Sequence, residues 1–434
     1  MRRSPSLFYR ALIAGGRHLV PAVSVLSEKA RVGHLARAGV GARLAEWART
    51  SRDRARPLVW MHAPSVGEGL QAEPVFRRLR ERHPSWQFAY TFFSPSAARF
   101  ALRLGADVAD YLPYDTLAEA RNAVEALRPS ALIFSKLDLW PQLATHAAER
   151  GTAVGLIAAT VRPGSGRLRW PARALLAPGY RAVERVGAIA TEDAERLARL
   201  GVAADRIEVV GDTRYDSVAE RVAAVAPDDP ILRLTAGGGP ALVAGSTWPP
   251  DEAALLRAFT RVLEARPDAR LVLVPHEPTP AHLEEVARTA VRLGLPAPVR
   301  LSAASGPVPL LLVDRVGVLA TIYGAGAAAW VGGGFGTAGL HSVLEPAAWY
   351  KPVMVGPNWG ESRDARLLLE AGGAWAASQG APAAAGAEIA ERWLEWLAGA
   401  APRRAGERAA AVVAAGIGAA DRTTALVEEL VASR

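Results

Sequence analysis

Cysteine is absent from the 434-residue sequence. Its absence excludes disulfide bonds, thiol nucleophiles and cysteine-ligated zinc or iron–sulfur centres, and it fits a cytoplasmic location. Histidines at metal-binding spacing are also missing, because no HExxH pair occurs and His276, His282 and His341 stand apart in the sequence. A GxSxG elbow, which marks many serine hydrolases, does not occur either. The sequence therefore predicts no metal site.

Acidic residues are fewer than basic ones. The 51 Lys and Arg exceed the 43 Asp and Glu, which gives a formal net charge of +8. That balance favours acidic partners such as nucleic acid, anionic lipid or phosphorylated sugars, although an arginine-rich genome would produce it as well. Because no RRM, KH, zinc-finger or helix-turn-helix signature occurs, we expect no nucleic-acid partner.

The amino-terminal segment lacks the unbroken apolar run of a membrane span. Residues 7–26 are largely apolar, but Arg10, Arg17 and His18 interrupt them, and a charge at mid-bilayer costs about 2.5–3.5 kcal/mol. A signal peptide would also need an uninterrupted apolar core and a cleavage site. We predict that residues 1–50 form a helical segment that lies on a membrane surface, the alternative being a helix packed on the protein body. The predicted lipid-facing side chains are Leu7, Phe8, Tyr9, Leu12, Ile13 and Val20.

Short apolar runs alternate with amphipathic stretches from residue 57 onward, as in the runs 57–63, 87–93 and 131–136. Buried strands that alternate with helices predict parallel sheets covered on both faces. The pattern fades where Pro, Asp and Gly crowd together, and it then restarts. We therefore predict an α/β protein with two doubly wound, Rossmann-like domains facing a cleft, in which ligands bind at the carboxyl ends of strands. The predicted parts are a membrane-associating segment 1–50, an acceptor domain 51–222, a linker 223–240, a nucleotide-donor domain 241–415 and a C-terminal helix 416–434, which could pack back on the first domain.

The turn HAPSVGEG, residues 62–69, places Glu68 between a predicted strand and a predicted helix. One interpretation is that Glu68 stabilises the helix dipole, which contributes about 0.3–1 kcal/mol. The other is that its carboxylate faces the cleft and takes a proton from a hydroxyl as a general base. In the next strand-end loop, Ser94 and Ser96 can either cap a helix or hold an anion.

Two further loops of the first predicted domain carry charged side chains. Lys136 and Asp138 follow an apolar strand, where they can pair with each other or face a ligand. Arg214 can bind a phosphate or carboxylate, or it can pair with Asp212 or Asp216. The same alternatives, a ligand contact or a local ion pair, stay open for both loops.

In the second predicted domain, Ser246 and Thr247 follow the first strand and suit either a phosphate or a helix cap. A glycine-rich loop, 332–339, separates a strand from a helix expected to begin near His341. Such a loop exposes backbone N–H groups to a phosphate, with the helix dipole behind them, unless the glycines serve only tight packing. It is neither a GxGxxG fingerprint nor a Walker loop. Glu345 lies one turn into the expected helix, within reach of a ribose hydroxyl.

With these loops in this order, the chain resembles the 3-deoxy-D-manno-octulosonic acid (Kdo) transferases, which add Kdo to lipid A precursors in the lipopolysaccharide inner core. The pieces that carry the resemblance are HAPSVGE, TFFSPS, GDTRYDSV, GSTWPPDE, VPHEP and GGGFGTAGLHSVLEPAAWYKPVMVGPN, spread over about residues 7–375. The chain is similar to the branch of the family that has Pro-His-Glu where the other branch has Pro-Arg-His. The resemblance implies a GT-B glycosyltransferase that uses CMP-Kdo without a metal or cofactor, at the cytoplasmic face of the inner membrane as a peripheral or N-terminally anchored protein.

The resemblance also implies roles for individual residues. The general base of the family falls on Glu68, and a second family glutamate falls on Asp138, which is one methylene shorter. The family's His-Asn pair is His341-Ser342 here, followed by the ribose-binding Glu345. The arginine of Pro-Arg-His is missing, so charge for the donor must come from the backbone, from Arg214 or from elsewhere. The predicted site comprises catalytic Glu68 and Asp138; donor-nucleotide contacts Ser246, Thr247, His276, Gly333, Gly334, Gly336, His341, Ser342 and Glu345; and acceptor or sugar contacts Ser65, Ser94, Ser96, Lys136 and Arg214.

Two other classes of function stay open. A different GT-B enzyme, either a nucleotide-sugar transferase or an epimerase, would share the fold. A non-catalytic, membrane-associated binding protein descended from such an enzyme would account for the altered Asp138 and Ser342. The unaltered Glu68, Glu345 and glycine-rich loop argue against that last alternative.

Overall fold

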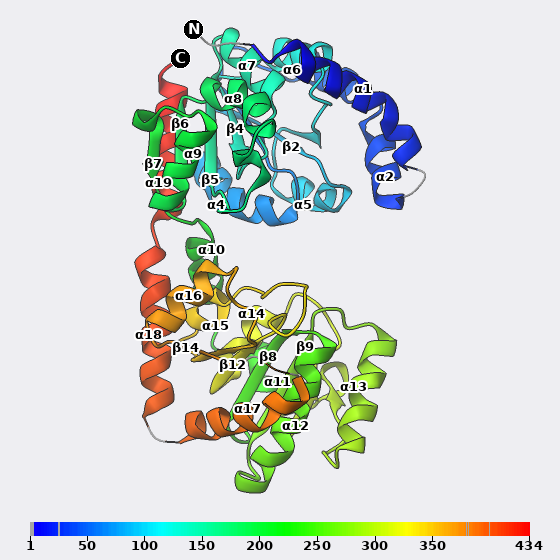
Figure 1. Ribbon diagram of the computed structural model, residues 1–434, viewed down its shortest axis with the longest axis vertical. Helices are drawn as coiled ribbons and strands as arrows, with labels where there is room; N and C mark the ends of the chain where they lie inside the picture. Colours follow the sequence, from blue (N-terminus) through cyan, green and yellow to red (C-terminus); the bar gives the residue numbers. More distant parts are fainter. Residues whose placement is uncertain (1–3, 25–26, 379, 381, 399) are drawn as a thin grey trace. The chain divides into compact units, whose positions relative to one another are not determined.

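The computed structural model describes residues 4–24, 27–378, 380, 382–398 and 400–434 (Figure 1). The described residues form two compact units. Unit 1 takes the chain up to Asp216 and resumes at Gly418, and unit 2 runs from Ser217 to Ile417. The corresponding boundaries predicted from the sequence lie after residues 222 and 415. Part of the predicted linker 223–240 forms the helix α11 (Pro230–Thr235).

A parallel sheet forms the centre of unit 1. Its described strands are β1 (Leu58–His62), β2 (Gln87–Phe92), β3 (Val108–Tyr111), β4 (Ala131–Ser135), β5 (Ala153–Ala159), β6 (Arg185–Ala188) and β7 (Ile207–Val209), in the order β3-β2-β1-β4-β5-β6-β7. β1, β2, β4 and β5 are buried along their whole length, as expected for a parallel sheet covered on both faces. The strand order reverses between β1 and β4, and such a reversal leaves a crevice at the carboxyl ends of the two strands.

Helices connect these strands and cover the sheet (Figure 1). Large apolar side chains from both layers, including Trp60, Phe76 and Phe134, are fully buried between them. α4 begins where its N-cap Ser65 accepts a hydrogen bond from the Gly67 amide, 3.3 Å away. The helices of unit 1 are α1 (Leu7–Ser24), α2 (Glu28–Arg37), α3 (Val40–Thr50), α4 (Val66–Arg82), α5 (Ala98–Arg103), α6 (Leu117–Leu127), α7 (Pro141–Glu149), α8 (Ala172–Ala182), α9 (Thr191–Leu200) and α19 (Ala419–Ala432), while α10 (Arg214–Ala223) crosses the unit boundary.

α1 rests on unit 1 through one buried tyrosine. The Tyr9 hydroxyl lies 2.8 Å from Oδ2 of Asp115, and Arg17 forms an ion pair with Glu119. The expectation that Tyr9 faces lipid is therefore wrong, because Tyr9 is only 5% exposed. The opposite face of α1 is apolar and open, since Leu7 is 81% exposed and Phe8 65%. α1 thus combines a packed face with an apolar face that the described part of the chain leaves uncovered.

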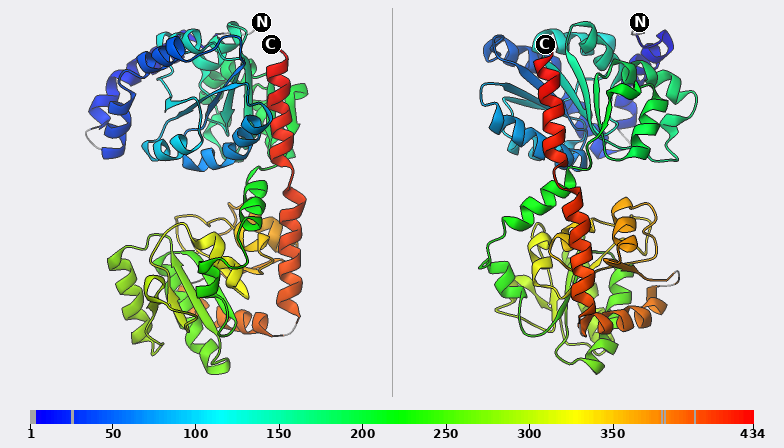
Figure 2. Two further views of the ribbon diagram at one scale, coloured as in Figure 1. Left: turned by 180° about the vertical axis from the view of Figure 1, so that it is seen from behind. Right: turned by 90° about the vertical axis from the view of Figure 1, so that its left-hand side faces the viewer.

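The last helix of the chain belongs to unit 1. α19 packs on α4 and on β4, β5 and β6 (Figure 2), and its Leu426 and Leu430 lie in the apolar core of this unit. Among the described residues, the stretch Ala401–Ala432 is long and apolar enough to cross a membrane by length and composition alone. It consists of α18 (Ala401–Gly416) and α19, with Gly418 in a left-handed conformation between them. Burial against unit 1 accounts for the apolar composition of α19.

Unit 2 repeats the architecture of unit 1. Its described strands are β8 (Ala241–Thr247), β9 (Arg270–Pro275), β10 (Val299–Arg300), β11 (Leu310–Leu312), β12 (Ala328–Val331), β13 (Val353–Val355) and β14 (Ala374–Ala376), all parallel, in the order β10-β11-β9-β8-β12-β13-β14. Here the order reverses between β8 and β12. The prediction of an α/β protein with two doubly wound sheets is confirmed.

The helices of unit 2 bury large aromatic side chains against this sheet. Phe259 stacks on Trp393 at 5.5 Å between ring centroids, and Trp330 of β12 is fully buried. These helices are α11, α12 (Pro249–Ala265), α13 (Pro280–Arg292), α14 (Leu319–Ile322), α15 (Leu344–Ala348), α16 (Arg363–Glu370), α17 (Pro382–Leu397) and α18.

Candidate active site

Glu68 lies in the first turn of α4, directly after β1 and at the strand-order reversal of unit 1. Both oxygens of its carboxylate have a partner. The Ser65 hydroxyl donates to Oε2, and Nζ of Lys136 lies 3.1 Å from Oε1. The Ser135 hydroxyl, at the end of β4, donates to the Glu68 carbonyl oxygen at 3.2 Å. β1 and β4 thus bring these polar groups together at one sheet edge.

The environment of Glu68 favours the ionised form. Burial of the carboxyl group disfavours its charge, but the hydrogen bond from Ser65 and the charge of Lys136 outweigh burial, so the pKa of Glu68 is lowered from its ordinary value. Its place at the positive end of α4 acts in the same direction. A carboxylate in this state is ready to accept a proton.

Lys136 and Asp138 do not pair with each other, contrary to one alternative from the sequence. Lys136 pairs with Glu68, while Oδ2 of Asp138 lies 3.0 Å from Nε2 of His62 and accepts a hydrogen bond from Trp140. Burial opposes ionisation of Asp138, but the bonds from His62 and Trp140 outweigh it and lower its pKa. His62 is fully buried at the end of β1. Its Nε2 faces the Asp138 carboxylate, and its Nδ1 lies 3.1 Å from the Thr91 hydroxyl and 3.0 Å from the Thr91 carbonyl oxygen.

The loop after β2 lies against the Glu68 turn. The backbone N–H groups of Phe93 and Ser94 both donate to the Pro64 carbonyl, and the Phe93 ring stacks on Trp140 at 5.5 Å. The hydroxyls of Ser94 and Ser96 lie 2.9 Å apart. Ser94 makes no side-chain capping bond within the described residues, so its hydroxyl is not committed to the short helix η1 (Pro95–Ala97).

Arg214 forms an ion pair with Asp212, which is one of the alternatives predicted from the sequence. Its Nε and Nη2 lie 2.9 and 2.7 Å from Oδ2 of Asp212. Asp216 instead accepts hydrogen bonds from the backbone N–H groups of Gly418 and Ala420, where α19 begins. Asp212 therefore competes with a donor group for the guanidinium group of Arg214.

In unit 2, three aromatic side chains meet at the carboxyl ends of the strands. The rings of His276 and His341 have centroids 4.4 Å apart, and Trp248 lies 4.9 Å from His276. Nε1 of Trp248 donates to Nε2 of His341 at 3.1 Å, which places the proton of a neutral His341 on Nδ1. Burial, and to a lesser degree the field of His276, lowers the pKa of His341. Trp248 is absent from the predicted site, although it sits inside the quoted motif GSTWPPDE.

The glycines of the glycine-rich loop differ in how much room a side chain would have. A Cβ on Gly332 would lie 2.2 Å from the Ser246 carbonyl oxygen, and one on Gly334 would lie 2.7 Å from backbone atoms of Gly356. Gly333 adopts a left-handed φ of 93°. Tight packing therefore explains these three glycines. Gly336 is different, because the nearest heavy atom to a Cβ there is 3.9 Å away.

Asp251 ties the start of this loop to the end of β8. Its carboxylate accepts hydrogen bonds from the backbone N–H groups of Gly333 and Trp248, at 2.9 and 3.0 Å, and from the Trp330 indole at 3.3 Å. Burial exceeds the effect of these bonds and raises the pKa of Asp251 to about 6. Thr247 is also occupied, since it is fully buried and its hydroxyl donates to Glu252 at 2.9 Å. Ser246, with a left-handed φ of 51°, is the more accessible of the two predicted hydroxyls.

Glu345 lies in the first turn of α15, and this helix begins at Leu344 rather than near His341. The shift leaves Ser342 exposed ahead of the helix. Oε1 of Glu345 lies 2.6 Å from Nη1 of Arg221. Burial nevertheless raises the pKa of Glu345, because the charge of Arg221 compensates only in part.

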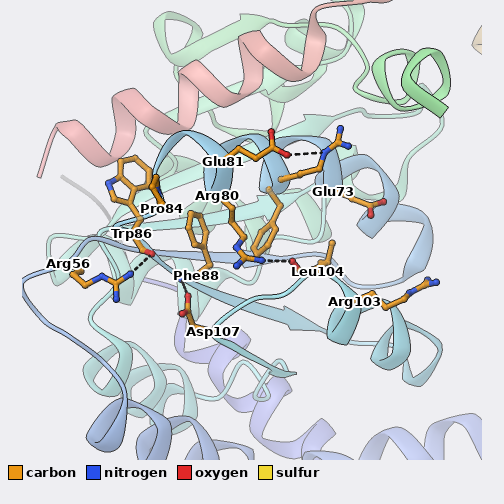
Figure 3. Close-up of a pocket in the computed structure, with 12 residues that line it drawn as sticks. Arg56, Glu73, Arg80, Glu81, Pro84, Trp86, Phe88, Arg103, Leu104 and Asp107 are labelled. Atoms are coloured by element: carbon orange, nitrogen blue, oxygen red, sulfur yellow. Dashed lines mark hydrogen bonds and ion pairs between the residues drawn. The ribbon is translucent and has the colours of Figure 1, made fainter. Parts of the chain in front are cut away.

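Within the described residues, no group of three or more Asp, Glu or His side chains is arranged to hold a metal ion. Two cavities of unit 1 are lined by residues other than those of the predicted site. One, of about 460 Å³, lies beside α4 and β2 (Figure 3), where Arg80 donates to the Leu104 carbonyl and Arg56 to the Trp86 carbonyl. The other, of about 790 Å³, lies at the amino ends of the strands.

Comparison with known proteins decides the family. The family model described as 3-deoxy-D-manno-octulosonic-acid transferase matches residues 38–217. The 3-deoxy-D-manno-octulosonic acid transferase of Bordetella pertussis is 30% identical over 392 residues, which cover 86% of this chain and 87% of that protein. The chain belongs to the Kdo transferase family. It is thus a glycosyltransferase, and the family predicted from the six motifs is confirmed.

Further comparisons agree with this family and fold. The transferase of Haemophilus influenzae is 25% identical over 305 residues, 69% of this chain and 70% of that protein. A solved UDP-GlcNAc 2-epimerase from Neisseria meningitidis is similar with a TM-score of 0.60 at 15% identity, covering 87% of this chain and 100% of that one. A solved glycosyltransferase from Rickettsia africae gives 0.56 at 10% identity, covering 86% and 98%. These structural likenesses show the GT-B fold alone.

Proposed function

We propose that this transferase moves Kdo from CMP-Kdo to a lipid A precursor, with inversion at the anomeric carbon, without a metal, and with Glu68 as the general base. The observation that carries the proposal is the Glu68 carboxylate. It stands at the strand-order reversal of unit 1, with its pKa lowered, and it is held by Ser65 and Lys136.

In the proposed reaction, a sugar hydroxyl of the acceptor attacks the anomeric carbon of the donor. The new carbon–oxygen bond forms as the bond to the CMP phosphate breaks, and CMP leaves with the bonding electron pair. Glu68 takes the hydroxyl proton. Asp138, paired with buried His62, is the second proposed catalytic carboxylate. Ser65, Ser94, Ser96 and Arg214 are proposed contacts of the acceptor or donor sugar, whereas Lys136, for which the sequence predicted the same role, pairs with Glu68.

The donor nucleotide is proposed to bind unit 2 at the carboxyl ends of β8, β9 and β12. The aromatic cluster of Trp248, His276 and His341 offers ring faces, and the open backbone at Gly336 offers a place for a phosphate. Backbone N–H groups would then stabilise the leaving phosphate without a metal. Ser246, Thr247, Gly333, Gly334, Ser342 and Glu345 complete the proposed donor site, with Thr247, Gly333 and Gly334 shaping it rather than contacting the nucleotide.

We further propose that the enzyme works at the cytoplasmic face of the inner membrane, as a peripheral or N-terminally anchored protein. The support is the exposed apolar face of α1, where Leu7, Phe8, Leu12 and Leu19 are all more than half exposed. An acceptor that carries acyl chains stays in the bilayer, so an enzyme with such a face can reach it.

Replacing Glu68 tests the proposal. Glu68→Gln keeps the size of the side chain but cannot take the proton, so transfer should fall by about 10²–10⁴-fold while CMP binding stays unchanged. The assay incubates purified protein with CMP-Kdo and a tetra-acylated lipid A precursor and weighs the product. Glu81→Gln, the same change in the last turn of α4, is the control and should retain activity. Full turnover by Glu68→Gln would refute the base assignment. Heat protection by UDP or GDP but not by CMP would refute the donor.

A further inference from the structure

We propose that Lys136 is a positioning residue, whose ammonium group fixes the Glu68 carboxylate in the orientation from which it takes the acceptor proton. The inference rests on the proposed role of Glu68 as the base. It assigns Lys136 a task that differs from a contact with substrate.

The backbone at Lys136 is built for this contact. Lys136 is the first residue after β4 and has a left-handed φ of 63°, a conformation that is unfavourable for a residue with a side chain. Its N–H donates to the Ile157 carbonyl of β5 at 2.8 Å, so the turn is anchored to the sheet. Such a conformation persists only where its surroundings hold it, and it is concentrated at functional sites.

Two successive residues at the end of β4 bind the same residue of α4. The Ser135 hydroxyl donates to the main-chain carbonyl of Glu68, and the Lys136 ammonium pairs with the Glu68 side chain. Since Ser65 holds the second carboxylate oxygen, the side chain is restrained from both sides. Without Lys136, one oxygen of a half-buried carboxylate would lose its partner.

Lys136 pairs with Glu68 rather than with the other charged residues nearby. Asp138, two residues further along, contacts His62 and not Lys136. Tyr90 of β2 also feels the charge of Glu68, but burial raises its pKa far above neutrality, so it stays uncharged. The negative charge of Glu73 on α4 also raises the pKa of Tyr90. As an anion, Glu73 cannot replace the positive charge of Lys136. Among the described residues, Lys136 is the cation that acts most strongly on the Glu68 carboxyl group.

The test is the pH dependence of kcat/KM in Lys136→Met, Lys136→Arg and the wild type. Loss of a cation at this distance should move the acid limb of the profile up by about one pH unit, at the low end of shifts caused by an opposite charge. At neutral pH, kcat should fall about tenfold or more while KM for CMP-Kdo stays within twofold. Lys136→Arg keeps the charge and should restore the acid limb. Arg199→Met, which removes an exposed cation from α9, is the control and should match the wild type.

An unchanged acid limb in Lys136→Met overturns the inference, and so does a rise in KM for CMP-Kdo with kcat intact, which would make Lys136 a substrate contact. Thermal midpoints measured alongside separate these results from misfolding, and if Lys136→Met is unfolded, Lys136→Gln, which also removes the charge, is measured in its place and must show the same rise of the acid limb. Glu68→Gln keeps the two proposals distinct. If that variant is fully active, the base assignment fails, whereas an inactive Glu68→Gln with an unchanged Lys136→Met profile refutes Lys136 alone.

Discussion

Two glycines of the glycine-rich loop should respond to alanine with opposite signs. A Cβ on Gly334 would lie 2.7 Å from both N and Cα of Gly356. These are backbone atoms, which cannot rotate away, so Gly334→Ala should destabilise unit 2 by about 1–3 kcal/mol, the usual cost of overpacking. At Gly336 the nearest atom is 3.9 Å away and φ lies outside the left-handed region. Gly336→Ala should therefore be neutral or stabilising by up to about 1 kcal/mol.

Thermal unfolding followed by tryptophan fluorescence measures this difference. For a unit of about 200 residues, each kcal/mol shifts the midpoint by roughly 2–4 °C, so Gly334→Ala should melt roughly 2–12 °C lower. Gly336→Ala should keep the wild-type midpoint but bind CMP more weakly in a calorimetric titration, because its methyl group would occupy the space proposed for the phosphate. A wild-type midpoint in Gly334→Ala would refute the packing argument, and wild-type CMP affinity in Gly336→Ala would refute the proposed approach of the phosphate.

Two buried carboxylates yield further predictions. Burial raises the pKa of Asp115 from 3.8 to about 7, so its contribution to stability is fully present below pH 4 and is lost as the pH rises through 7, by on the order of 4 kcal/mol. Asp115→Asn should remove this decline, and thermal midpoints from pH 4 to 8 would show it; a decline as steep as that of the wild type would contradict the assignment. Asp251→Asn turns an amide group toward the N–H donors of Gly333, Trp248 and Trp330, and it should destabilise unit 2 by about 1–3 kcal/mol and weaken CMP binding. Unaltered CMP affinity would show that the loop does not depend on Asp251.

The amino-acid sequence was sufficient to predict the two sheets and the sheet edge at which the candidate site lies. Apolar runs separated by amphipathic stretches specify buried parallel strands, because only a strand covered on both faces is apolar at every position. Loops that follow such strands collect at one edge, so Glu68, Lys136 and Asp138 could be assigned to one region. The order of the six motifs also identified the family.

Tertiary structure alone decided which groups pair. Glu68 and Lys136 are 68 positions apart and lie 3.1 Å apart at their charged atoms. Lys136 does not pair with the nearer Asp138, because the backbone turns at Lys136 with a left-handed φ and Asp138 has buried His62 as its partner. Tyr9 faces the protein interior for a similar reason, since its hydroxyl group hydrogen-bonds to the carboxylate of Asp115. Periodicity reports which face of an element is buried, but a partner is chosen by backbone conformation and by strands that are distant in the chain.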